Sequence, residues 1–249
     1  MKTLAAIPVY NEAESIAEVV AETLRYVDDL LVVDDGSTDG TTDVLKDLSM
    51  PGLVVRYHGT NRGYGRSLMD AFDYAIDKRF DCLVTLDADG QHEPEAIPQL
   101  VADIGVADIV SGSRYLMRFP GASTPPVERQ CVNKKITALL RWKLGFDITD
   151  AFCGFKAYRV KVLKRLRLTE EGYAMPLQLW VQAALLGLTV HEVPVKLIYR
   201  DVNRSFGGSL DRTAVRMRYY LDVIDREYRG MRSIAAELTC APLGSRGAD

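Results

Sequence analysis

The sequence predicts an α/β fold: a doubly wound, mostly parallel sheet with flanking helices in a single domain. Short apolar, β-branched segments alternate with helical patterns over roughly the first 113 residues, as in repeated strand–helix–strand units. At 249 residues, the chain is long enough for one large α/β domain. Its 47% hydrophobic and 26% charged residues are ordinary for a globular protein.

The first part of the chain supplies a regular series of elements. Short apolar runs bounded by turn residues predict strands at 4–9, 30–33, 53–57, 83–86 and 107–111. Between them, helices are expected at about 12–26, 41–48, 63–79 and 94–104. The segment Ser37-Thr38-Asp39 can cap the second helix, and Leu68, Phe72 and Ile76 share one face of the third.

The second part is less regular. A loop is expected at 119–126, a strand within 190–199, and helices at 128–144, 157–166, 177–186 and 212–228. Gly187 can end the helix that precedes it. We expect one domain over 1–230, with halves at about 1–117 and 118–230, followed by a flexible tail at 231–249.

Composition argues against several classes of protein. A net charge of −3 argues against general nucleic-acid binding, and three histidines make a histidine-built metal site or catalytic triad an unattractive hypothesis. The four cysteines are far apart, which favours a reducing compartment over a disulfide framework. The sequence opens directly into a strand without a secretory signal, and no apolar stretch reaches the roughly 20 residues that span a bilayer.

The motif Asp87-Ala88-Asp89 follows the apolar segment 82–86 and precedes Gly90-Gln91. Open α/β sheets bind ligands at the carboxyl ends of their strands. Two carboxylates there can converge on a hard cation such as Mg²⁺ or Mn²⁺, which keeps positions open for phosphate oxygens. The motif therefore predicts a metal–diphosphate site, although in isolation an Asp-rich turn is an alternative interpretation.

Five segments fall at predicted strand ends or turns: 8–12, 34–40, 61–65, 87–91 and 112–115. Their combination and order resemble the family 2 glycosyltransferases of the GT-A fold, especially dolichyl-phosphate mannose synthases and related polyprenyl-phosphate sugar transferases. The resemblance covers roughly residues 3–230 and makes 1–117 the nucleotide-sugar half.

The resemblance implies a role for each matched donor-side residue. Pro8, Tyr10 and Glu12 would line the nucleotide pocket, and Asp35 would contact the base or ribose. Asp87 would lie near the ribose or diphosphate and, with Asp89 and Gln91, would hold the Mg²⁺ or Mn²⁺ ion. Arg114 would balance the charge of the diphosphate. The turn at 61–63 is left outside the core site.

The acceptor half is matched by two segments. In Thr149–Arg159, which resembles the acceptor-side segment, Asp150 would approach the transferred sugar. Residues 151–154 depart from the Thr-Gly-Ser-Phe of many relatives, which puts the sugar contacts in question. In the segment after the 193–198 strand, Arg200 and Arg204 are predicted to bind the acceptor phosphate.

The resemblance implies inverting transfer of mannose or glucose from a nucleotide-diphosphate sugar to a polyprenyl or dolichyl phosphate. Between Arg129 and Arg167 there are eleven Lys or Arg and two Asp, a segment that could contact anionic headgroups with Trp142 and Phe146 at the interface. The expected location is the cytoplasmic membrane face, peripherally or through a membrane partner. Two alternatives stay open: a saccharide or small-molecule acceptor with Asp150 or another carboxylate as base, and a non-catalytic nucleotide-sugar-binding protein.

Overall fold

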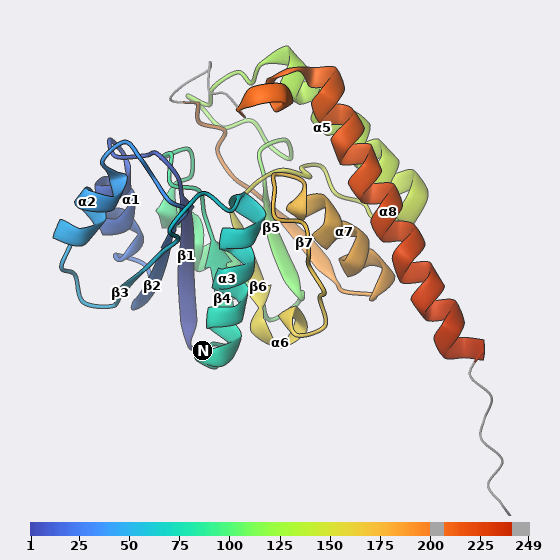
Figure 1. Cartoon of the computed structure of the whole chain (residues 1–249), viewed down its shortest axis with the longest axis horizontal. Coiled ribbons are helices and arrows are strands. Elements are labelled where there is room, and N and C mark those ends of the chain that lie inside the picture. Colours follow the sequence, from blue (N-terminus) through green and yellow to red (C-terminus); the bar gives the residue numbers. More distant parts are fainter. Residues whose placement is uncertain (200–206, 241–249) are drawn as a thin grey trace, which may run out of the picture.

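The computed structural model describes residues 1–199 and 207–240, with side chains described as far as Ser233. Seven strands form one sheet: β1 (Thr3–Val9), β2 (Asp29–Asp34), β3 (Leu53–Tyr57), β4 (Cys82–Thr85), β5 (Ile109–Ser113), β6 (Lys156–Arg159) and β7 (Val190–Pro194). The strand order is β3-β2-β1-β4-β6-β5-β7, and every strand except β6 runs in the same direction (Figure 1). The predicted mostly parallel α/β fold is confirmed.

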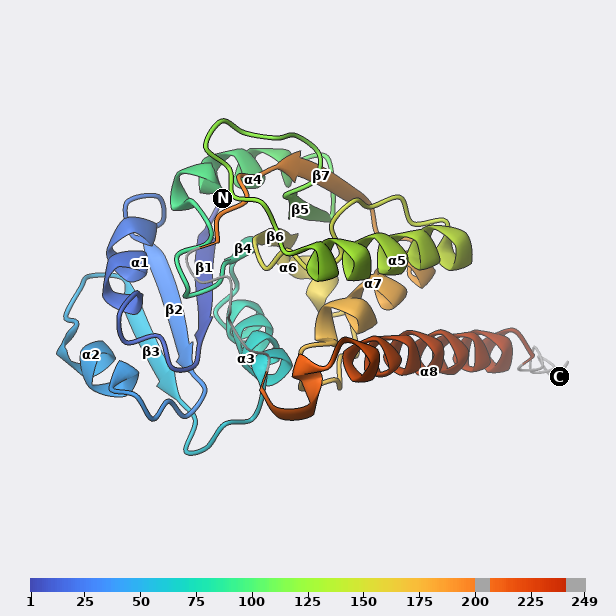
Figure 2. The ribbon, with the colours of Figure 1, turned by 90° about the horizontal axis from the view of Figure 1, so that it is seen from above.

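Helices cover both faces of this sheet. They are α1 (Ile16–Thr23), α2 (Thr41–Asp47), α3 (Tyr64–Asp77), α4 (Ile97–Asp103), α5 (Val127–Leu144), α6 (Val160–Leu163), α7 (Met175–Leu185) and α8 (Thr213–Cys240), with short 3₁₀ turns η1 (Pro94–Ala96) and η2 (Gly208–Asp211). Viewed from above, α4 lies on one side of the sheet, and α3 and α7 lie on the other (Figure 2).

The apolar core is split by the sheet into two layers. Successive residues of β1 alternate between them: Leu4 joins the layer under α3, α5, α7 and α8, whereas Ala5 and Ile7 join the layer under α1 and α4. This alternation follows from the two-residue period of a strand. Because β1 is buried on both faces, its sequence is a continuous apolar run instead of an alternating one.

Strand β6 corrects the predicted helix at 157–166. The four residues Lys156–Arg159 run antiparallel between β4 and β5, and only Val160–Leu163 is helical. A strand this short, buried on both faces and beginning with a lysine has no visible period, so only its neighbours in the sheet reveal it.

The last helix also differs from the expectation. α8 continues to Cys240, beyond the expected start of the flexible tail at 231, and residues 241–249 lie outside the described part of the chain. Ion pairs Arg216–Glu128 and Lys143–Asp225 join α8 to α5. Within residues 1–199 and 207–240, no helix combines the length and apolar character needed to cross a bilayer.

Candidate active site

A cavity of about 290 Å³ lies at the carboxyl ends of the parallel strands, along the upper edge of the sheet in Figure 1. Eight of the residues singled out in the sequence line it: Pro8, Tyr10, Glu12, Asp35, Asp87, Asp89, Gln91 and Arg114. They come together because β2, β1 and β4 are neighbours and end at the same edge, with β5 two positions beyond β4. Their individual roles stay predictions.

The carboxylate of Asp87 is oriented by two side chains. The Tyr64 hydroxyl donates to Oδ1 at 3.1 Å, and Nε2 of His92 lies 3.0 Å from Oδ2. Burial, and then the charge of Asp87, raise the pKa of Tyr64 well above its ordinary value, so the phenol keeps its proton. Among the residues that the structure describes, Nδ1 of His92 is buried without a hydrogen-bond partner, which places the ring proton on Nε2, facing Asp87.

A tight turn at Gly90 sets the positions of Asp89 and Gln91. The backbone N–H of Gln91 donates to Oδ1 of Asp89 at 3.0 Å, and Gly90 between them has φ +66°. The start of α1 is fixed to the same turn, because the Ser15 hydroxyl donates to the carbonyl of Ala88 at 2.8 Å. Both side chains therefore project from a braced loop onto the cavity.

Arg114 and Asp150, which the sequence assigned to separate roles, form one buried ion pair. Nε and Nη2 of Arg114 donate to the two carboxylate oxygens of Asp150 at 2.7 and 3.0 Å. The side chain of Asp150 is 0% exposed, and it is not among the cavity-lining residues of the described chain. Burial acts to raise the pKa of Asp150, but the charge and hydrogen bonds of Arg114 outweigh it and lower the pKa.

The segment that carries Asp150 is held from two sides. Glu192 on β7 accepts from the backbone and hydroxyl of Thr149 at 2.8 and 2.9 Å and from the backbone of Asp150 at 3.1 Å. From α5, Asn133 donates to the carbonyl of Thr149 and accepts from the backbone of Ala151. The position of Arg114 at the cavity thus depends on contacts from a strand and a helix far apart in sequence.

The rest of the wall comes from residues that sequence reasoning missed. Asn61 and Gly63 belong to the turn at 61–63 that was left outside the site, and Tyr64 directly follows it; all three line the cavity. Two further arginines and several apolar and aromatic side chains also line the cavity: Arg129, Arg216, Val132, Phe152, Tyr173, Tyr199 and Tyr220. A tyrosine beside a glycine-rich turn was the available signal for Tyr64, whereas helical Arg129 and Arg216 resemble ordinary surface cations in the sequence. Arg200 and Arg204 lie outside the described residues.

The family model described as "Glycosyl transferase family 2" matches residues 5–167, which include β1 to α6 and every donor-side motif. The chain belongs to glycosyl transferase family 2. An undecaprenyl-phosphate mannosyltransferase of Micrococcus luteus is 33% identical over 214 residues, 82% of this chain and 87% of that protein. A polyprenol monophosphomannose synthase of Mycolicibacterium smegmatis is 34% identical over 227 residues, 86% of this chain and 84% of its own length.

Solved structures share the fold of this family 2 glycosyltransferase. Mannosyl-3-phosphoglycerate synthase from Rubrobacter xylanophilus superposes with a TM-score of 0.70 at 18% identity, covering 94% of this chain and 75% of that one. Glucosyl-3-phosphoglycerate synthase from Mycobacterium tuberculosis, in complex with Mn²⁺, uridine diphosphate and glucosyl-3-phosphoglycerate, gives 0.67 at 20% identity, covering 91% and 79%. The expected GT-A fold is confirmed.

The donor set of this glycosyltransferase fits a divalent cation shared with a ligand. Among the described side chains, those of residues 1–199 and 207–233, no group of three or more His, Cys, Asp or Glu could hold a metal ion. Asp87, Asp89 and Gln91 instead offer two carboxylates and an amide at one cavity edge. Hard cations that take few protein oxygens complete their shell with water and phosphate oxygens. The chemistry of these donors therefore suits Mg²⁺ or Mn²⁺ bound together with a diphosphate.

Gly154 sets the position of Asp87, which leads to a first prediction. A Cβ atom at position 154 would clash with both carboxylate oxygens of Asp87. We expect Gly154→Ala to weaken metal-dependent nucleotide binding by about tenfold or more. Mutating a group that orients a metal-binding side chain typically lowers metal affinity 10- to 100-fold. Titration calorimetry with Mn²⁺ and GDP or UDP measures it. Gly105→Ala is the control, because its Cβ would meet only a carbonyl oxygen 3.7 Å away; equal affinities in the two variants would contradict the prediction.

Proposed function

We propose that the protein transfers a hexose, with inversion, from a nucleotide-diphosphate sugar to a polyprenyl or dolichyl phosphate. The observation that carries the proposal is the composition of one cavity. Asp87, Asp89, Gln91 and Arg114 form its donor edge, and arginine, apolar and aromatic side chains line the rest of it. The names of the two bacterial relatives, which specify mannose and polyprenyl-type lipids, make GDP-mannose the leading donor and leave UDP-glucose as a second.

The donor edge stabilises the leaving group. As the glycosidic bond breaks, its electron pair and negative charge pass to the nucleoside diphosphate. Arg114 places a guanidinium at the cavity, and its pKa is raised well above the ordinary value because Asp150 outweighs the opposing effect of burial. Two of its five N–H donors face Asp150, so others can face phosphate oxygens. A bound Mg²⁺ or Mn²⁺ would supply Lewis-acid stabilisation of the same diphosphate.

The acceptor needs little help from a base. A phosphate monoester is already ionised near neutral pH, so its oxygen can attack the anomeric carbon directly, opposite the departing diphosphate. A saccharide hydroxyl would need a base, and both oxygens of the obvious carboxylate, Asp150, accept hydrogen bonds from Arg114. This arrangement favours the phosphate acceptor. Arg129 and Arg216 on the cavity wall, with Arg200 and Arg204 from the sequence, are proposed to bind that phosphate.

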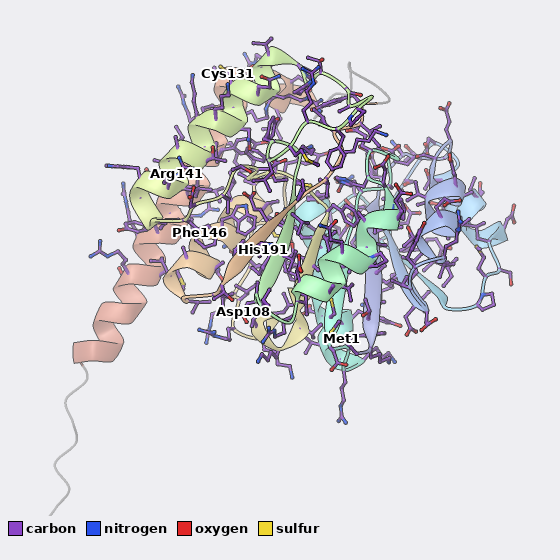
Figure 3. The ribbon with its side chains drawn as sticks, turned by 180° about the vertical axis from the view of Figure 1, so that it is seen from behind. Met1, Asp108, Cys131, Arg141, Phe146 and His191 are labelled. Atoms are coloured by element: carbon purple, nitrogen blue, oxygen red, sulfur yellow. The ribbon has the colours of Figure 1, made fainter. Side chains whose placement is uncertain are left out.

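The proposal includes a peripheral position on the cytoplasmic face of a membrane, with or without an anchoring partner. The basic segment does not form one surface, because α6 starts at the opposite end of the sheet from the cavity and Lys156 is buried. The part of the basic segment that lies on α5 can still serve as a membrane-contacting surface. That helix lines the cavity with Arg129 and Asn133, and its other face exposes Cys131, Lys134, Lys135, Arg141 and Trp142. Cys131 and Arg141 are labelled on this helix in Figure 3.

Vesicle binding tests this outer face of α5. We expect sedimentation with anionic vesicles to fall several-fold when Lys134 and Lys135 are both changed to Glu, since each cation near an anionic surface contributes about 1 kcal/mol. The control changes Lys161 and Lys164 to Glu; these exposed cations belong to the α6 region. Equal loss in both double variants would contradict a specific role for α5.

Transfer itself is tested by incubating the purified protein with Mn²⁺ or Mg²⁺, a panel of nucleotide sugars and a short polyprenyl phosphate. We expect sugar on the lipid phosphate and none on saccharide acceptors. Transfer to saccharides alone would support the alternative acceptor class. Nucleotide binding without transfer from any common donor would support a non-catalytic binding protein.

A further inference from the structure

His58, which directly follows β3, bridges two carboxylates beside the cavity. Its Nδ1 lies 2.6 Å from Oδ1 of Asp35 at the end of β2, and its Nε2 lies 2.8 Å from Oδ2 of Asp70 on α3. The imidazole is only 8% exposed. No role follows for this histidine from the sequence motifs, and it stands on the far side of Asp35 from the proposed metal ligands.

The partners determine the chemistry of the ring. An ionised carboxylate only accepts hydrogen bonds, so both ring nitrogens must donate, and the ring is an imidazolium in this arrangement. The other charged group facing the cluster is Arg66 on α3, which pairs with Asp70 and lies 3.8 Å from Asp73. Burial acts to raise the pKa of Asp70, but the hydrogen bonds from Arg66 and His58 outweigh it and lower the pKa. The cations His58 and Arg66 thus face the buried carboxylate of Asp35 and the partly buried carboxylate of Asp70.

The bridge determines where one wall of the cavity lies. Besides His58, the carboxylate of Asp35 accepts the backbone N–H of Arg62 on Oδ1 and that of Gly63 on Oδ2, both at 2.8 Å. Asp35, Asn61 and Gly63 all line the cavity. The loop after β2 and the loop after β3 are closely packed, since a Cβ on Gly36 would lie 2.6 Å from the carbonyl carbon of Thr60. The rotation of one carboxylate therefore sets the position of the 61–63 turn.

We infer that His58 is a positioning residue for the donor nucleotide: as an imidazolium anchored on Asp70, it holds Asp35 and the 61–63 turn in the arrangement that lines the cavity. The identity of the ligand as a nucleotide rests on the proposed function. The geometry of this clamp, formed by His58, Asp35 and the 61–63 turn, does not, because it consists of hydrogen bonds within the chain. Backbone amide exchange at Arg62 and Gly63 reports on the clamp directly.

Two substitutions separate the two arms of the bridge. In His58→Asn, the side-chain amide nitrogen can replace Nδ1 and keep the bond to Asp35. In His58→Gln, it can replace Nε2 and keep the bond to Asp70. We expect His58→Gln to speed amide exchange at Arg62 and Gly63 and to weaken GDP–Mn²⁺ or UDP–Mn²⁺ binding about tenfold, the usual scale for a lost charged hydrogen bond. His58→Asn should change both measurements less than His58→Gln does, because it keeps the bond to Asp35 and loses only the anchor on Asp70.

The protonation state of the ring gives a further readout. The chain has three histidines, so nitrogen-15 spectra of the imidazoles can assign the protonation of His58 directly. His191→Gln is the control, because this ring is 53% exposed and far along the sheet.

Unchanged amide exchange in His58→Gln, or a wild-type ring with one unprotonated nitrogen at neutral pH, would overturn the inference, whatever the enzyme transfers. Failure of the wild-type protein to bind any nucleotide, with a normal amide response in the variants, would count against the proposed function alone.

Discussion

Replacing Asp89 with alanine is expected to reduce metal-dependent nucleotide binding by at least about 100-fold while leaving the fold intact. Loss of an outer-shell partner costs 10- to 100-fold in metal affinity, and a direct ligand should cost more. The fold should survive because Asp89 is partly exposed on a loop after β4 and accepts from the Gln91 backbone within its own turn. Calorimetric titration with Mn²⁺ and GDP or UDP gives the affinity, and thermal unfolding checks the fold.

The control for this variant is Asp43→Ala. Asp43 lies on α2 with its side chain 82% exposed and paired with Lys46. Its removal takes away the same charge without touching the cavity, so nucleotide affinity should not change. If the Asp89 variant kept its metal-dependent binding, another residue would have to hold the cation, and the assignment of Asp89 would be lost.

Changing Asp150 to asparagine is expected to lower the free energy of unfolding by about 3 kcal/mol. Removing one partner of a buried ion pair leaves the other charge without compensation in a poorly solvated place, which typically costs 3–5 kcal/mol. Arg114 is the charge left behind, and its side chain is only 16% exposed. Chemical denaturation measures the loss. Asp147→Asn is the matched control, because its pair with Arg141 is exposed and should contribute less than about 1 kcal/mol.

The difference in unfolding free energy between the wild type and Asp150→Asn should depend on pH in a definite direction. The pKa of Asp150 is below its ordinary value in the folded protein, so the unfolded chain takes up the proton first as the pH falls. The contribution of the pair should be complete above about pH 4, near the unfolded pKa of aspartate, and should be lost as pH falls further through the folded pKa. A stability difference between wild type and Asp150→Asn that already declined between pH 7 and pH 5 would contradict this account.

The sequence allowed prediction of the strands and strand-end residues because both leave local signals. β1, β2 and β4 are apolar runs, and each is followed by polar residues that reach the cavity. The position of Asp89 near Arg114 then followed from parallel strands ending at a common edge. Such signals need no knowledge of contacts between distant segments.

The remaining features depend on contacts that no local pattern encodes. The Arg114–Asp150 pair joins residues 36 apart in the chain. The contacts of His58 with Asp35 and Asp70 bring together the ends of β3 and β2 and helix α3. β6 was mistaken for a helix because its residues favour a strand only between β4 and β5. The basic segment failed as a single surface for the same reason, since β6 reverses the chain and carries α6 to the opposite end of the sheet.

The antiparallel strand β6 also limits where the chain can be divided into fragments. It belongs to the part of the chain after residue 117, yet it separates β4 from β5, which both precede that point. An N-terminal fragment ending at residue 117 would therefore lack the strand that pairs with both β4 and β5. Recombination between relatives should exchange the whole block from β4 to β6, because a crossover inside it would build adjacent strands of one sheet from two parents.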